Sequence, residues 1–182
     1  KLYEGENMNY AEIKTFDVAN GPGIRVSLFV SGCNHRCPGC FNEQAWDFNF
    51  GQPFTQETID YIIDTLSFGA YQGVTFLGGE PMEPVNQKGL LPLARKIKET
   101  YPEKDIWCFT GYDFEKDIIG HMYNECPETK ELLSYIDVLV DGPFIEAQKN
   151  LNLVFRGSEN QRLIRIPETL KTGNIVLWEK EM

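Results

Sequence analysis

The stretch that decides the fold is IRVSLFVSGCNHRCPGCF, residues 24–41. Its first part, Ile24 to Val30, is a continuous run of mostly β-branched and apolar side chains, which predicts a buried strand. The residues that follow place Cys33, Cys37 and Cys40 in the spacing C-x3-C-x2-C. Three thiols that close together converge on one small object, so the sequence predicts a strand that ends in a binding loop.

Strand and helix patterns alternate along the rest of the chain. Strands are predicted at residues 73–77, 105–110 and 136–140, and helices after Thr55 and at 87–100, 114–122 and 128–135. Pro92 is expected near the first turn of its helix, and Leu151 to Phe155 is expected to be a last strand. This alternation implies parallel strands joined by right-handed crossovers.

The unusual motifs of the chain each follow the predicted end of a strand. Gly78-Gly79-Glu80-Pro81, Thr110-Gly111-Tyr112 and Asp141-Gly142-Pro143-Phe144 all occupy this position. In parallel α/β folds, ligands bind at the carboxyl ends of the strands. A closed barrel of eight units takes about 250 residues, so a chain of 182 residues predicts one domain with an open, partial β/α barrel.

The number of clustered cysteines narrows the chemistry. Structural zinc and ordinary ferredoxin clusters take four protein ligands, whereas a cubane cluster held by three cysteines leaves one iron free to activate a small molecule. Zinc with His35 or a distant residue as fourth ligand stays open as an alternative. A disulfide is disfavoured because the three cysteines are an odd set and no secretory segment precedes them. Cys108 is expected to be a core thiol and Cys126 a turn thiol.

Composition excludes several classes of function. The net charge is −10, with 17 basic residues among 27 acidic ones, which argues against a nucleic-acid partner. No run of about 18 apolar residues predicts a membrane helix, and the start of the chain lacks the apolar region of a signal peptide, so a cytoplasmic protein is expected. Two histidines and no nucleophile motif leave hydrolase chemistry little to rest on.

The cysteine spacing, together with Gly78-Gly79-Glu80, resembles the radical S-adenosylmethionine (SAM) enzymes. The resemblance implies a radical SAM type of partial barrel and a [4Fe–4S] cluster held by Cys33, Cys37 and Cys40, with SAM bound at the open iron. It implies SAM contacts from Gly78, Gly79 and Glu80, where Glu80 orients the loop or meets the amino group. Many members have an aromatic residue where this chain has Gly39, so the backbone of Gly39 and Cys40, with Phe41, is expected to line the adenine site.

Further stretches resemble the activating enzymes of glycyl-radical enzymes, and in particular those of anaerobic ribonucleotide reductase. They are Asn20 to Arg25 (NGPGIR), Asp105 to Tyr112 (DIW and TGY) and Arg156 to Gln161 (RGSENQ). The resemblance implies that SAM is cleaved reductively and that the resulting radical takes a hydrogen atom from a glycine of the large reductase subunit. It implies two partners, that subunit and a flavodoxin-like electron donor of low potential, with neither nucleic acid nor membrane.

The match covers Met8 to about Arg162. Residues 1–7 are interpreted as an extension, and residues 163–182 as a C-terminal extension without a functional interpretation. The alternatives are an activase of pyruvate formate-lyase type and a non-catalytic zinc-binding interaction module. The RGSENQ run and the short chain favour the reductase, and this run is expected to dock it. Arg25, Asp141 and Arg156 each stay open between a structural and a functional role.

Overall fold

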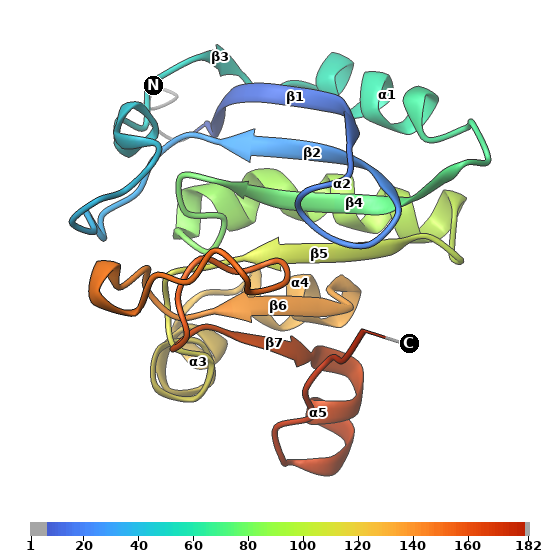
Figure 1. The fold of residues 1–182 in the computed structure, drawn as a ribbon. Coiled ribbons are helices and arrows are strands. Elements are labelled where there is room, and N and C mark those ends of the chain that lie inside the picture. The colour runs from blue at the N-terminus through green and yellow to red at the C-terminus, as the bar shows by residue number, and fades with distance from the viewer. Residues whose placement is uncertain (1–6, 181–182) are drawn as a thin grey trace.

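A computed structural model describes residues 7–180 (Figure 1). The expected extension at residues 1–7 therefore lies, for residues 1–6, outside the described part of the chain. The elements in chain order are β1 (Asn9–Asp17), β2 (Ile24–Val30), η1 (Glu43–Trp46), β3 (Gln52–Pro53), α1 (Gln56–Thr65), β4 (Tyr71–Gly78), α2 (Pro84–Thr100), β5 (Asp105–Phe109), η2 (Phe114–Met122), α3 (Tyr123–Glu125), α4 (Thr129–Tyr135), β6 (Val138–Asp141), η3 (Glu146–Gln148), β7 (Arg162–Arg165) and α5 (Ile166–Thr172).

The strands form one open sheet of seven strands in the order β3-β1-β2-β4-β5-β6-β7. The four middle strands, β2, β4, β5 and β6, run parallel, as predicted. Both edges are antiparallel, since β1 pairs with β2 and β3, and β7 pairs with β6. The prediction of an open α/β sheet is confirmed, whereas an entirely parallel sheet is wrong, because the edge strands return by loops rather than by helical crossovers.

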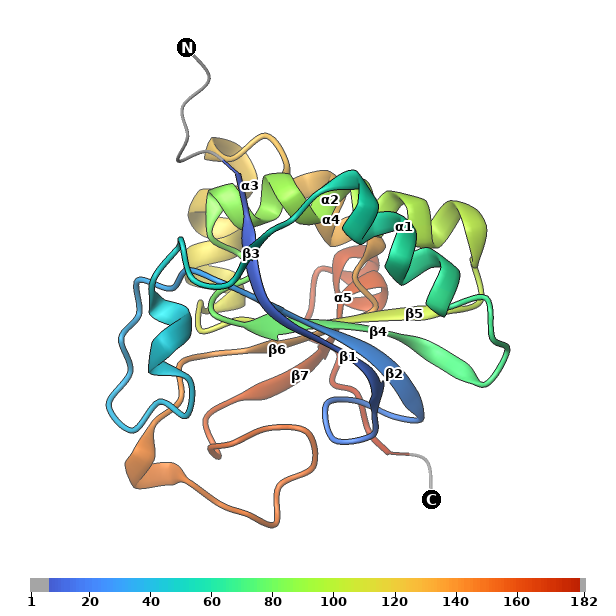
Figure 2. The ribbon, with the colours of Figure 1, turned by 90° about the horizontal axis from the view of Figure 1, so that it is seen from above.

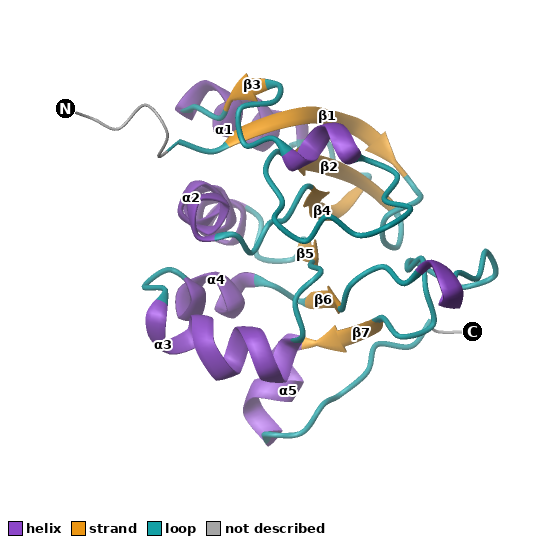
Figure 3. Cartoon of the chain, turned by 90° about the vertical axis from the view of Figure 1, so that its left-hand side faces the viewer, coloured by secondary structure: helices purple, strands orange, loops and turns teal. Residues whose placement is uncertain are grey.

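Helices cover one face of this sheet, and the long loops with η1 and η3 lie on the other (Figures 2 and 3). Helix α1 begins as predicted, with Thr55 and Thr58 forming a reciprocal capping box. Helix α2 begins earlier than predicted, with Pro84 in its first turn, which places Pro92 in its interior rather than near its start. Pro92 is exposed, so the carbonyl that loses its helical partner there faces the solvent side.

One predicted strand is wrong. Residues 151–155 are part of a loop, and the last strand is β7 instead, which begins at Arg162. Leu151 is 89% exposed, while Phe155 takes a positive φ of 55°, a conformation that strands do not use. The Phe155 ring packs against Trp107 and Trp178, at centroid distances of 5.4 and 5.8 Å. The apolar run therefore anchors a loop and does not extend the sheet.

The core lies between the sheet and its helices. It contains the inward side chains of β2, β4 and β5, among them Leu28 and Phe76, and of α2, among them Leu90 and Ile97. Cys108 belongs to this core, as predicted, and is fully buried. Within residues 7–180, the helices are too short or too polar for any of them to cross a membrane.

Candidate functional site

The carboxyl ends of the parallel strands bring the sequence motifs together. Residues 31–41, here called the cysteine loop, follow β2, and the Gly-Gly-Glu turn follows β4. Backbone hydrogen bonds join these two exits, with the amide of Gly79 donating to the carbonyl of Val30 at 2.7 Å and that of Glu80 to Gly32 at 2.8 Å. The exits of β5 and β6 are joined in the same way, since Thr110 N–H donates to Val140 at 2.8 Å. The edge of the sheet therefore continues into the loops.

These exits surround one cavity of about 270 Å³. The cavity receives all three cysteines of the motif and five of the six predicted SAM-binding residues, counting Cys40 in both sets. Its lining comprises Cys33, His35, Cys37, Cys40, Phe41, Asn42, Trp46, Leu77, Gly78, Gly79, Glu80, Phe109, Thr110, Gly111, Gly142, Phe144, Gly157 and Gln161. Gly39 is not among them: it has a positive φ, and a side chain there would meet the carboxylate of Glu146 at 3.0 Å. Gly39 therefore shapes the turn that presents Cys40.

The three thiols are half-buried. Burial raises the pKa of Cys33 to about 11, an effect that the backbone amides of His35 and Arg36 oppose. Because iron binds thiolates, a bound cation would have to overcome this burial and draw the proton from Cys33. The donor set of soft sulfur atoms suits zinc and iron–sulfur clusters alike.

Among the described residues, oxygens of Asp113, Glu115 and Asp141 lie within 4.8 Å of one another, which is close enough to hold a cation. The acidic group is occupied by the guanidinium of Arg162, at 2.6 Å from Asp141 and 2.7 Å from Glu115.

The two glycines of the Gly-Gly-Glu turn are required by the protein's own backbone. Gly78 has a φ of 106°, and a Cβ there would lie 2.7 Å from backbone atoms of Val30. A Cβ on Gly79 would lie 2.6 Å from the carbonyl oxygen of Gly32. These contacts are shorter than real side chains make, so the glycines allow the end of β4 to pack directly on the cysteine loop. The same residues also present bare backbone to the cavity.

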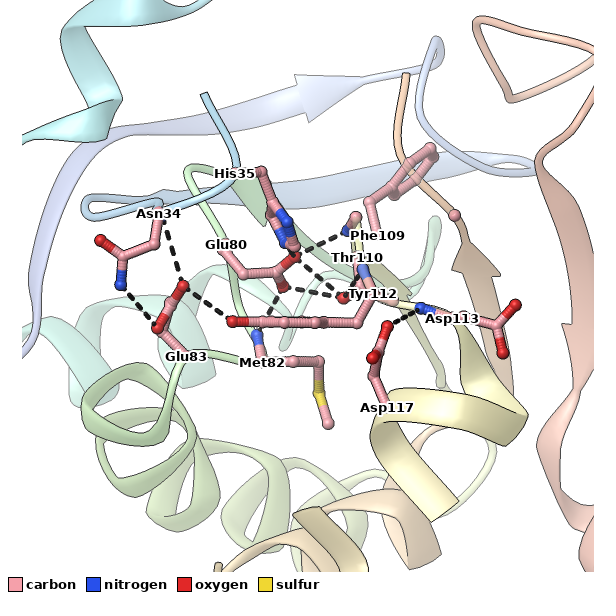
Figure 4. A network of polar contacts seen from close by, with 12 residues as sticks. Asn34, His35, Glu80, Met82, Glu83, Phe109, Thr110, Tyr112, Asp113 and Asp117 are labelled. Carbon is pink, nitrogen blue, oxygen red and sulfur yellow. Dashed lines mark hydrogen bonds and ion pairs between the residues drawn. The ribbon is translucent and has the colours of Figure 1, made fainter. Parts of the chain in front are cut away.

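Glu80 is the centre of a polar network beneath the cysteine loop (Figure 4). It is 1% exposed, and its carboxylate interacts with the ring of His35 at 2.7 Å and with the hydroxyl of Thr110 at 2.9 Å. Burial opposes a charge on His35, but the hydrogen bond to Glu80 and its negative charge raise the pKa of His35 above the ordinary value. His35 is thus a partner of Glu80 through its Nε2 atom.

All three residues left open between structure and function have partners within the protein. Arg25 is fully buried at the opposite ends of the strands, where it pairs with Asp105 at 2.6 Å. Asp141 is buried, accepts from the amide of Phe114 at 2.9 Å and pairs with Arg162. Arg156, the third, donates to the carbonyl of Gln161 within its own loop at 2.5 Å.

The sequence interpretation missed several cavity residues. Phe144 packs on Phe41 with ring centroids 5.5 Å apart, and Trp46 and Phe109 also line the cavity. Phe109 ends β5, and Phe144 lies in the loop that follows β6. The expectation that ligands bind at strand ends therefore indicated their segments, but not the direction of their side chains. Trp46 follows no strand, and its sequence position carries no signal of this role.

Comparison with known proteins places the site in a class of iron–sulfur proteins. Residues 19–164 match the family described as "4Fe-4S single cluster domain". This match spans all three cysteines and favours a cluster over the zinc alternative.

Individual relatives narrow the class. The chain is 42% identical over 156 residues to the anaerobic ribonucleoside-triphosphate reductase-activating protein of Escherichia coli K12, covering 85% of this chain and 96% of that one. It is 44% identical over 158 residues to the protein of that name from Enterobacteria phage T4, covering 86% and 93%. The Vibrio cholerae protein is 43% identical over 161 residues, covering 87% and 98%. The chain belongs to the family of anaerobic ribonucleoside-triphosphate reductase-activating proteins.

Proposed function

We propose that this protein activates anaerobic ribonucleoside-triphosphate reductase by reductive cleavage of SAM and generation of a glycyl radical on the reductase. The observation that carries the proposal is the convergence of Cys33, Cys37, Cys40 and the Gly-Gly-Glu turn on one cavity at the carboxyl edge of the parallel strands. Family membership supplies the reductase as the partner, since the relatives are named for its activation.

Different residues of the cavity bind the cluster and SAM. Cys33, Cys37 and Cys40 hold a [4Fe–4S] cluster, and Gly78, Gly79, Cys40 and Phe41 bind SAM. When bound, the cluster would supply the electron for reductive cleavage of SAM, and the adenosyl fragment of SAM would take up the hydrogen atom that leaves a glycine of the reductase. Phe41 and Phe144 form an apolar wall of the cavity.

Four finer points belong to the same proposal. The open sheet is a partial barrel of the radical SAM type, with its cavity on the face opposite the helices. The donor of the electron is a flavodoxin-like protein of low potential, and the protein works in the cytoplasm. The reductase, not this chain, binds the nucleotides.

Two cysteine variants test the proposal. Cys37→Ala removes a cluster ligand, and Cys108→Ala is its matched control, because Cys108 is a buried core thiol away from the cavity. After anaerobic reconstitution with iron and sulfide, Cys37→Ala should lose the absorbance near 400 nm, roughly the charge-transfer region of Cys-ligated clusters, and the glycyl radical signal in electron paramagnetic resonance. Cys108→Ala should keep both and lose about 1 kcal/mol of stability.

The outcomes discriminate clearly. A Cys37→Ala protein that still installs the glycyl radical at the normal yield contradicts the cluster assignment. Wild-type protein that carries the cluster and cleaves SAM but never produces a radical on the reductase contradicts the choice of partner. A colourless wild-type protein that retains one zinc ion contradicts the whole proposal.

A further inference from the structure

Two buried carboxylates hold the first turn of the cysteine loop. The backbone amide and the side-chain amide of Asn34 both donate to Glu83, at 3.3 Å each. The ring of the next residue, His35, meets Glu80 at 2.7 Å. Glu80 is 1% exposed and Glu83 5%. Residues 34 and 35 lie in neither strand nor helix. The side-chain contacts with Glu80 and Glu83 therefore fix this segment, as backbone hydrogen bonds fix the strands and helices.

Glu80 uses both of its oxygens for protein donors. Oε1 interacts with His35, with the hydroxyl of Thr110 at 2.9 Å and with the amide of Gly111 at 2.7 Å. Oε2 accepts from the amide of Met82 at 2.8 Å and also from Thr110 at 2.9 Å. An ionised carboxylate offers about four lone-pair sites. Nearly its whole accepting capacity is therefore spent inside the protein.

His35 sits in a slot that the exit of β5 provides. A Cβ on Gly111 would lie 2.8 Å from the His35 ring, so only glycine at 111 leaves the space. The ring of Tyr112 packs edge-on against His35 at 4.3 Å, and its hydroxyl donates to Glu83 at 3.0 Å. Figure 4 shows these side chains converging beneath the loop from three different segments. The loop between the first two cysteines is thus tied to the ends of β4 and β5 at once.

We propose that Glu80 is a positioning residue that holds the cysteine loop through His35, and that it does not itself bind SAM. Glu83 holds Asn34 in the same way. This inference rests on the proposed cluster site at Cys33, Cys37 and Cys40, because its consequence is that the loop is set in its cluster-binding shape before iron arrives. A preformed loop loses less conformational freedom when its ligands close on a cluster.

Glutamine at position 80 is a sharp perturbation. It keeps the size of the side chain but turns one acceptor oxygen into an NH₂ donor, which must then face the N–H of Met82 or the donors of Thr110 and Gly111. His35→Leu removes the partner from the other side, and His35→Gln restores a side chain that can donate to Glu80. Glu43→Gln is the matched control, because Glu43 is an exposed carboxylate in η1, close after the loop.

The first measurement uses the metal-free full chain and needs no cofactor. Hydrogen–deuterium exchange of peptides covering residues 33–37 should be about tenfold faster or more in Glu80→Gln and His35→Leu, since each loses a hydrogen bond to a charged group. His35→Gln should lie nearer to wild type, and Glu43→Gln should equal it. Thermal unfolding of the same proteins identifies any variant that is globally unfolded. Tyr112→Phe removes only the hydroxyl that donates to Glu83, and it therefore tests the contacts of Glu83 separately from those of Glu80.

The second measurement uses the anaerobically reconstituted protein. A ferrous chelator should remove iron about tenfold faster or more from Glu80→Gln and from His35→Leu. The double variant should be no more than about threefold faster than the faster single variant, because both changes remove one shared contact. SAM affinity is then measured on cluster-loaded Glu80→Gln protein. The fold-decrease in this affinity should be no larger than the fold-increase in the rate of iron removal.

Two results would overturn the inference. Unchanged exchange at residues 33–37 in a folded Glu80→Gln protein would mean that the carboxylate does not hold the loop. Loss of SAM binding with wild-type iron retention would make Glu80 a direct SAM ligand. Failure of the reductase to acquire a radical, with both loop effects present, would count against the proposed function and not against this role of Glu80.

Discussion

Replacing Arg25 with methionine tests whether the arginine of the NGPGIR motif serves the fold or the chemistry. Its guanidinium is fully buried and donates to the carboxylate of Asp105 at 2.6 Å, to the hydroxyl of Thr75 at 2.8 Å and to the carbonyl of Val74 at 2.9 Å. It also lies 5.7 Å from the centre of the Trp107 ring. These partners belong to β4 and β5, and none of them lines the cavity.

The magnitude follows from what the substitution leaves behind. Methionine fills much of the same space but donates nothing, so the carboxylate and the buried carbonyl lose their partner. Removing one member of a buried ion pair costs about 3–5 kcal/mol. Burial lowers the pKa of Arg25 even beside Asp105, which means that relief of its desolvation offsets part of the loss. For a domain of this size each kcal/mol shifts the unfolding midpoint by about 2–4 °C, so a decrease of about 10 °C is expected.

Circular dichroism during heating of the metal-free protein measures this shift directly. Arg95→Met is the control, because Arg95 pairs with Glu131 at the surface, and its midpoint should equal that of wild type. Below the lowered midpoint, Arg25→Met should still take up its cluster. An unchanged unfolding midpoint combined with lost cluster uptake or SAM cleavage would refute the structural role and indicate that Arg25 acts in the reaction.

Three further predictions follow from other contacts. Gly79→Ala should abolish stable cluster uptake, because its Cβ would lie 2.6 Å from the carbonyl of Gly32. Gly69→Ala is the control and should bind iron normally, because a Cβ there would have no atom within 4 Å. Equal iron uptake in the two variants would show that the close packing at Gly79 is not needed. Trp178→Ala should make the loop at residues 143–161 more sensitive to protease, since Trp178 packs on its anchor at 5.8 Å, and an unchanged cleavage rate would contradict it. Burial acts to raise the pKa of Asp17, but its hydrogen bonds hold that pKa below the ordinary value. The stability that Asp17 contributes should therefore be complete above about pH 5 and be lost as the pH falls below about 4 through the lowered folded pKa. Urea unfolding across this range should show a flatter pH dependence for Asp17→Asn, and parallel curves would count against it.

The arrangement of the site was readable from the sequence because its determinants are local. The apolar run Ile24 to Val30 became β2 with the predicted bounds, and the motifs that follow predicted strands meet at one edge. Hydrophobic periodicity decides whether a segment is strand or helix within about ten residues, and strand–helix alternation then dictates parallel neighbours. These rules alone predict that the three cysteines and the Gly-Gly-Glu turn lie at the same edge of the sheet, and in the structure they line one cavity.

Tertiary structure alone decided which side chains face one another across those strand ends. Glu80 and Thr110 are 30 residues apart and Arg25 and Asp105 are 80 apart, and no local pattern encodes such pairs. The position of Phe155 also depends on distant residues. Its apolar run is typical of a strand, but in the structure its ring packs against Trp107 and Trp178, and the run forms a loop. Local sequence sets the type of an element and the residues that leave its end, whereas packing between distant segments sets which of those residues hold the fold and which face the cavity.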